Sequence, residues 1–198
     1  MLKEKTHRPP EKLGDRLIQE AMLGDLAAVR RLVADGADID FANAKGFTPL
    51  MAAAHWKRLN VVRFLLENGA DEKLVERVTG MNALMYACLS GSLESLELIL
   101  GASRDVNGTD CYGRTVLMMA VATGKVEAVK LLVKAGAGIN AQDEFGNTAL
   151  DLAVRGESEE VIAFLGSKGS LRGWESRVEK TKGEESRTSF PGVSRDRS

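Results

Sequence analysis

The chain has 198 residues, of which 44% are hydrophobic and 5% aromatic, and its 27 basic and 28 acidic residues give a formal net charge of −1. This length fits one domain or one array of repeats, and a core with few rings must be built mainly from Leu, Val, Ile and Ala. The balanced charge provides no field to attract nucleic acid or an anionic membrane surface, so neither is an expected partner.

The cysteine content and the N-terminus bear on the compartment. Cys88 and Cys111 are too few for a disulfide scaffold or a zinc site. The stretch MLKEKTHRPPEK contains no apolar segment of the kind a secretory signal needs, and nowhere do roughly 18 apolar residues run together. We therefore expect no membrane insertion and a cytoplasmic or other reducing intracellular compartment. Residues 1–11 are expected to form a flexible lead-in.

A motif recurs along the chain after this lead-in. DRLIQEAMLGDLAAVRRLVADGAD at 15–38 fits the template first, without a leading glycine. The clearer copies are GFTPLMAAA at 46–54, GMNALMYAC at 80–88, GRTVLMMAV at 113–121 and GNTALDLAV at 146–154. Their leading glycines are 34, 33 and 33 residues apart. A fixed period of this length predicts a stack of repeated structural units.

Each copy is followed by a second apolar run that ends near a glycine, as in NVVRFLLENGAD at 60–71. Thr48 is placed to cap the first helix of its unit, and Pro49 suits the first turn. Gly36, Gly69, Gly136 and Gly169 follow the second helices, where a left-handed residue can end a helix. The polar stretches NAKG, DCYG and DEFG before the first helices predict hairpin tips.

These residues resemble the ankyrin repeat family, which has a 33-residue period and a Thr-Pro-Leu-His-x-Ala signature. The resemblance covers residues 12–169 and implies an all-α ankyrin-repeat solenoid of helix-turn-helix units joined by β-hairpin loops. The five units span about 12–42, 43–76, 77–109, 110–142 and 143–169. The family's His, which makes hydrogen bonds between repeats, is replaced here by Met51, Met85, Met118 and Asp151.

Two regions depart from the pattern. The third unit has Ser103 and Arg104 in place of Gly-Ala and carries a one-residue insertion near EKLVERV, which predicts a local change of geometry. Residues 170–198 are rich in Ser, Gly and charge, and are expected to be largely disordered. A short capping helix through Leu171, Trp174 and Val178 is the alternative, which Gly173 weakens.

No group of residues suggests catalysis. The histidines are His7 and His55, and no glycine-rich phosphate loop occurs. We therefore expect no enzyme, no cofactor and no metal. Cys88 is expected in the core and Cys111 on a hairpin tip. The resemblance permits hydroxylation of Asn107 and Asn140, but the favoured interpretation is that these side chains close turns by hydrogen bonds to the backbone.

Stacked repeats present an extended concave surface, and the resemblance implies that it binds another protein. Internal alignment places ten candidate partner-binding residues at the hairpin tips and the ends of the first helices. They are Lys45, Phe47, His55, Trp56, Met81, Leu89, Tyr112, Arg114, Phe145 and Asn147. Scarce aromatic residues on one surface favour an interface, with Trp56 as its anchor. The alternative is that Phe47 and Trp56 only pack on each other.

The sequence thus predicts a monomeric protein–protein interaction module, acting as an adaptor, scaffold or inhibitor of an unidentified protein partner. The alternative is a passive structural or targeting subunit whose signal lies in the terminal tails. Capture of the partner by a tail-deleted protein would favour the first hypothesis.

Overall fold

The computed structural model describes residues 10–103, 105–173 and 175, which fold into ten helices without a β-strand. Residues 1–9 of the predicted lead-in, Arg104 and most of the predicted tail lie outside these residues. The helices are α1 (Pro10–Leu23), α2 (Leu26–Ala34), α3 (Pro49–His55), α4 (Leu59–Glu67), α5 (Ala83–Ser90), α6 (Leu93–Ala102), α7 (Val116–Ala122), α8 (Val126–Lys134), α9 (Ala149–Arg155) and α10 (Glu159–Ser167). The first helix begins at Pro10, two residues before the predicted start of the array.

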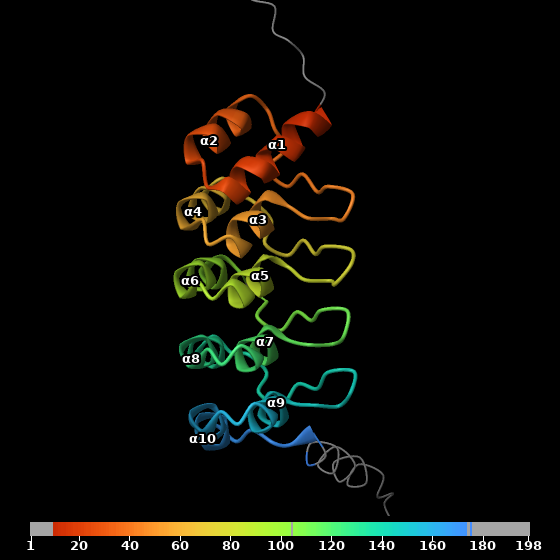
Figure 1. Cartoon of the computed structure of the whole chain (residues 1–198), viewed down its shortest axis with the longest axis vertical. Helices are drawn as coiled ribbons and strands as arrows, with labels where there is room; N and C mark the ends of the chain where they lie inside the picture. The colour runs from red at the N-terminus through yellow and green to blue at the C-terminus, as the bar shows by residue number, and fades with distance from the viewer. Residues whose placement is uncertain (1–9, 104, 174, 176–198) are drawn as a thin grey trace, which may run out of the picture.

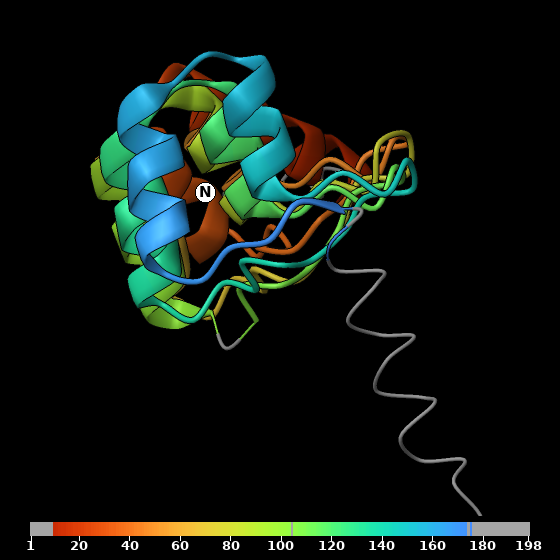
Figure 2. The ribbon, with the colours of Figure 1, turned by 90° about the horizontal axis from the view of Figure 1, so that it is seen from below.

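The helices pair into five units stacked in one direction (Figure 1). The odd-numbered helices contact one another along an inner column, and the even-numbered helices form an outer column. Seen along the stack, the hairpin loops all project to one side of the two columns (Figure 2). The predicted all-α repeat solenoid is therefore confirmed.

The inner helices begin where the sequence predicted. Thr48, Thr115 and Thr148 each accept a hydrogen bond from the backbone N–H three residues on, and Asn82 does the same in the third unit. Ala52, Ala53 and Ala54 are fully buried. Small side chains at this face allow neighbouring inner helices to approach closely, which is the condition for stacking.

The outer helices end where the sequence predicted as well. Gly36, Gly69, Gly136 and Gly169 have φ between +80° and +92°, a left-handed conformation that other residues rarely adopt. The third unit has no such glycine, and α6 ends at Ala102, followed by Ser103 with an extended backbone.

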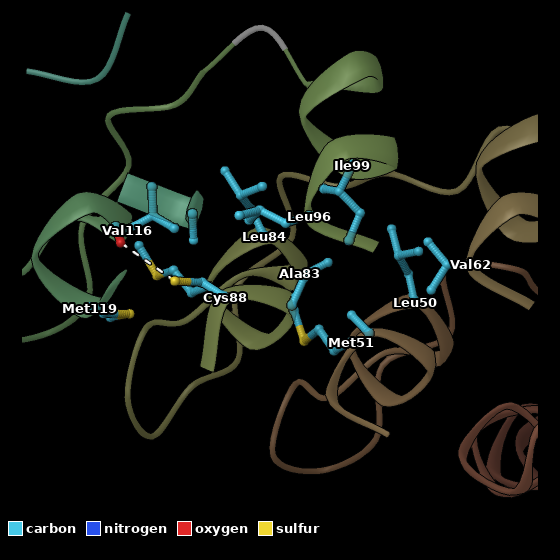
Figure 3. Close-up of a cluster of buried hydrophobic side chains, with 14 of the residues drawn as sticks. Leu50, Met51, Val62, Ala83, Leu84, Cys88, Leu96, Ile99, Val116 and Met119 are labelled. Atoms are coloured by element: carbon cyan, nitrogen blue, oxygen red, sulfur yellow. Dashed lines mark hydrogen bonds between the residues drawn. The ribbon is translucent and has the colours of Figure 1, made fainter. Parts of the chain in front are cut away.

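The core runs without a break through successive units. Figure 3 shows Leu50 and Val62 of the second unit, Cys88 and Leu96 of the third, and Val116 of the fourth in one apolar cluster. The Cys88 thiol is buried and lies 3.7 Å from the carbonyl oxygen of Val116. The expectation that Cys88 is a core residue is confirmed.

Side chains at one recurring position connect neighbouring units at three of the four junctions. Asp40 Oδ1 accepts a hydrogen bond from the Asp71 N–H at 2.8 Å, and Asn107 Oδ1 accepts one from the Gly138 N–H at 2.8 Å. Asn140 Oδ1 accepts one from Leu171 at 2.7 Å. The interpretation that Asn107 and Asn140 close their own turns is wrong, because their oxygens reach backbone groups 31 residues further on.

The packed region extends past the predicted boundary at Gly169. Thr148 Oγ1 donates to the Leu171 carbonyl at 2.7 Å, and Gln142 Nε2 donates to the Gly173 carbonyl at 2.6 Å. Asp151 Oδ2 accepts from the Gly173 N–H at 2.6 Å. Residues 170–173 are therefore docked on the fifth unit, which corrects the expectation of disorder for this short segment.

Asp151, which stands where the family has His, connects this segment to the array. Its second oxygen lies 2.9 Å from Arg172 Nε. Burial raises the pKa of Asp151, but hydrogen bonds from Thr148 and Gly173 outweigh burial and hold the pKa below its ordinary value. The ionised carboxylate is thus the form that holds the segment.

We expect Leu132→Ala to lower the free energy of unfolding by ~2–5 kcal/mol, because Leu132 is fully buried in α8 and truncation leaves a cavity. Urea denaturation measures the change. A loss below about 0.5 kcal/mol, the range of surface substitutions, would contradict the packing of the fourth unit.

We expect Gly173→Ala to displace the docked segment, because a Cβ there would lie 1.9 Å from the Gly146 carbonyl oxygen. Hydrogen exchange at Leu171 should become faster, and stability should fall by about 1–2 kcal/mol. Gly166→Ala in α10 is the matched control, since its Cβ meets no atom within 4 Å. Unchanged protection of Leu171 in Gly173→Ala would show that the segment is not held in this way.

Candidate partner-binding surface

The hairpin tips form a continuous ridge beside the inner helices. The N–H groups of Arg77, Cys111 and Glu144 donate to the carbonyls of Lys45, Thr79 and Tyr112, at 2.7, 2.8 and 3.0 Å. Each tip is thereby joined to the next by a main-chain hydrogen bond. The accepting carbonyl belongs in each case to the residue before the tip glycine. The ridge is therefore held by backbone hydrogen bonds and not by the side chains of Lys45 and Tyr112.

One acceptor side chain stabilises each tip from within. Asn43, Asp110 and Asp143 each accept backbone N–H groups two and four residues further along. In the tip that leads into the third unit, this place belongs to Glu76. Its backbone N–H donates to the Met81 carbonyl five residues further along, whereas the other tips close over four residues. The insertion noted in the sequence is therefore accommodated in this tip, and the longer Glu side chain spans the longer loop.

Four aromatic rings of the second and third units contact one another beside the hairpin ridge. The ring centroid of Phe47 lies 6.4 Å from that of Trp56 and 5.2 Å from that of Tyr86. His55 lies 4.4 Å from Trp56 and 5.5 Å from Tyr86, and all four pairs meet edge to face. We call these four residues the aromatic cluster. Trp56 remains 41% exposed within it.

Three of the four residues were predicted to share this surface, and Tyr86 was not. Tyr86 lies within α5 at the position of Ala52 in α3, whereas the prediction considered only the ends of the first helices. A signal was available, because the internal alignment places one aromatic residue in a column otherwise occupied by Ala52, Met119 and Leu152.

A buried carboxylate lies beside the aromatic cluster. Glu76 is only 4% exposed and accepts hydrogen bonds from the Val78 N–H at 2.9 Å and from the N–H and hydroxyl of Thr79. Burial raises the pKa of Glu76, but these hydrogen bonds outweigh it and hold the pKa below its ordinary value. Burial, with the charge of Glu76, raises the pKa of the Tyr86 hydroxyl. Glu76 is thus an ionised support of the hairpin that leads into the third unit.

The other predicted residues do not join the cluster. Tyr112 and Phe145 lie on hairpin tips, with Phe145 73% exposed, and Leu89 is exposed at the end of α5. Lys45 is exposed on the tip of the second unit, and Met81 is half-buried against the core.

Arg114 and Asn147 bind their own hairpins. Arg114 lies 2.6 Å from Asp110 and over the ring of Tyr112, while Asn147 Nδ2 donates to both oxygens of Asp143. Their side chains therefore stabilise their own hairpins, a structural role beyond the predicted place on the partner-binding surface.

The described residues contain neither a metal-binding cluster nor a membrane-spanning helix. Within residues 10–103, 105–173 and 175, no three His, Cys, Asp or Glu side chains gather in a way that could hold a metal ion. No helix in this part of the chain has the length and apolar character needed to cross a bilayer.

A cavity of about 250 Å³ lies between the third and fourth units, lined by Cys88, Leu96 and Lys125 among others. Burial raises the pKa of the Cys88 thiol to about 12, although the charge of Lys125 acts in the opposite direction. A thiol with such a pKa stays protonated at neutral pH and is a poor nucleophile.

Known proteins resemble most of the described chain. A family model described as ankyrin repeats in three copies matches residues 17–110 and 97–171. Mouse ankyrin repeat domain-containing protein 63 is 36% identical over 122 residues, covering 58% of this chain and 30% of the mouse protein. Putative ankyrin repeat protein YahD of Escherichia coli K12 is 30% identical over 93 residues, covering 47% of this chain and 46% of that protein. Palmitoyltransferase Hip14 of Drosophila melanogaster is 29% identical over 107 residues, covering 52% of this chain and 17% of the fly protein. The chain therefore spans less than half the length of each of these relatives.

We expect Glu76→Gln to make the free energy of unfolding fall less steeply as the pH is lowered. A carboxylate whose pKa is lower in the folded state stabilises the protein above its unfolded-state pKa, and this contribution is lost as the pH falls through the lower folded-state value. Urea midpoints measured from neutral pH to below about pH 4 should therefore fall less steeply in the variant than in the wild type. Glu97→Gln, on the exposed side of α6, is the control and should change the slope less than Glu76→Gln does. Equal slopes for Glu76→Gln and the wild type would show that Glu76 does not carry this linkage.

Proposed function

Because the chain belongs to the ankyrin repeat family, whose members are in general protein–protein interaction modules, we propose that it binds a partner protein on the face formed by the hairpin ridge and the inner helices. The aromatic cluster is the proposed anchor of this interface. Repeat arrays bind through such extended surfaces because successive units present equivalent positions side by side.

The observation that carries the proposal is the exposure of Trp56 within the aromatic cluster. Its ring contacts Phe47 and His55, yet the residue is 41% exposed. A large ring fixed in one position loses little conformational freedom when a partner covers it, and such rings dominate the energetics of interfaces. The exposed side chains of Leu89, Tyr112 and Phe145 extend the apolar surface available to a partner.

A role as adaptor, scaffold or inhibitor is part of this proposal, as is the absence of enzymatic activity. Two of the relatives carry names that describe only their ankyrin repeats. The name of the fly relative describes a palmitoyltransferase, but the similarity covers 17% of that protein. The similarity therefore supports a shared binding array and not a shared reaction.

We expect Trp56→Ala to weaken partner capture by well over tenfold, since truncation of a buried aromatic anchor commonly costs ~2–4 kcal/mol of binding free energy. Its stability should fall by about 0.5–1.5 kcal/mol, because the variant loses the edge-to-face contacts with Phe47 and His55. Quantitative affinity capture by the immobilised full chain, with thermal denaturation of each variant, measures both effects.

Phe164→Ala, on the outer helix α10, is the matched aromatic control and should leave capture unchanged. A photo-crosslinking residue placed at position 56 should also give partner adducts that the same residue at position 164 does not give. Equal capture by wild type and Trp56→Ala, with crosslinks only elsewhere, would place the interface away from the aromatic cluster.

A further inference from the structure

The sequence contains two asparagines followed by glycine, Asn68 and Asn107. In such a pair the backbone nitrogen of the glycine can attack the side-chain carbonyl carbon of the asparagine, because no Cβ on the glycine obstructs the approach. The two sites have the same local sequence, so any difference in their reactivity must come from the fold.

The fold treats the two glycine nitrogens differently. The N–H of Gly69 donates to the Leu66 carbonyl at 3.1 Å, and the leaving amide of Asn68 donates to the Phe64 carbonyl at 2.8 Å. Both groups of the first site are thus held in helix-ending hydrogen bonds. The N–H of Gly108 makes no helix-ending bond of this kind, and the next residue, Thr109, pairs with Thr115 in an antiparallel bridge. Asn68 and Asn107 are both exposed to water.

The side-chain carbonyl carbon of Asn107, which the Gly108 nitrogen would attack, is also activated. Asn107 Oδ1 accepts the 2.8 Å hydrogen bond from the Gly138 N–H of the next unit. A donor on this oxygen stabilises the negative charge that develops there when a nucleophile adds to the carbonyl carbon. Asn140, which makes the equivalent bond in the fourth unit, is followed by Ala141, whose N–H donates to the Gly138 carbonyl.

We propose that Asn107 is a site of spontaneous deamidation. The Gly108 nitrogen loses its proton and forms a bond to the Asn107 side-chain carbonyl carbon. The bond from that carbon to Nδ2 then breaks, and ammonia leaves. Water adds to either carbonyl of the resulting cyclic imide and opens it to aspartate or isoaspartate. One water is consumed, one ammonia is released, and nothing is oxidised or reduced.

The two products differ in their effect on the junction between the third and fourth units. Aspartate keeps an oxygen in place to accept the Gly138 N–H, as Asp40 already does for Asp71 at the first junction. Isoaspartate carries the side-chain methylene in its main chain, so the backbone lengthens and the remaining carboxylate is displaced. The isoaspartate product therefore loses the bond to Gly138.

Incubation of the full chain at mildly alkaline pH, followed by peptide mapping with mass spectrometry, tests the proposal. In the folded protein, replacement of amide by carboxylate at Asn107 should be severalfold faster than at Asn68. In denaturant the two rates should become similar, because the fold no longer distinguishes them. Equal rates in the folded state, or a faster reaction at Asn68, would overturn the proposal.

Gly108→Ala provides the matched variant. The added Cβ would lie 3.5 Å from Asn82 Nδ2, an ordinary contact, so the variant should fold normally while its deamidation at Asn107 slows severalfold. Hydrogen exchange at Gly138 gives a second readout. Protection should persist in Asn107→Asp and be lost in the isoaspartate fraction of an aged sample. An unchanged rate in Gly108→Ala, or full protection in that fraction, would contradict the mechanism.

Discussion

Hydrogen bonds between successive units are the constraint on which the rest of this structure depends. A single unit has one apolar inner helix, one outer helix and a hairpin tip. Alone, it would leave apolar surface exposed and the carbonyl groups at the tip unpaired. The next unit supplies the missing partners: its N–H groups reach the preceding tip, as Arg77 reaches Lys45, and the preceding side chain, as Gly138 reaches Asn107. Fully buried alanines such as Ala53 keep the inner helices close enough for these bonds to form.

The aromatic cluster is a consequence of this stacking. Phe47 comes from the base of a hairpin, His55 and Trp56 from the end of α3, and Tyr86 from α5 of the following unit. Only the fixed spacing between units two and three brings the rings together. A partner that covers the cluster therefore contacts a surface shared by two units, and its affinity depends on their junction as well as on the rings.

Most of the fold could be predicted because its determinants are local. Thr48 before Pro49 predicts a helix start, and Gly69 after a polar turn predicts a helix end, whatever the rest of the chain does. The candidate site was predicted only in part, because ring contacts depend on side-chain directions across units. The same limit explains Asn107, for which the sequence suggests a local turn while its partner lies 31 residues away. Composition likewise could not reveal the hydrogen bonds that dock residues 170–173.

That docked segment bears on how long the stack can become. The last unit of any repeat array exposes the surface to which a further unit would add, and in a second molecule that further unit could be its own first repeat. Here the Thr148 hydroxyl and the Asp151 carboxylate at this end are already engaged by Leu171 and Gly173. Any unit or molecule that stacks on these two groups would first have to displace residues 171–173 from them.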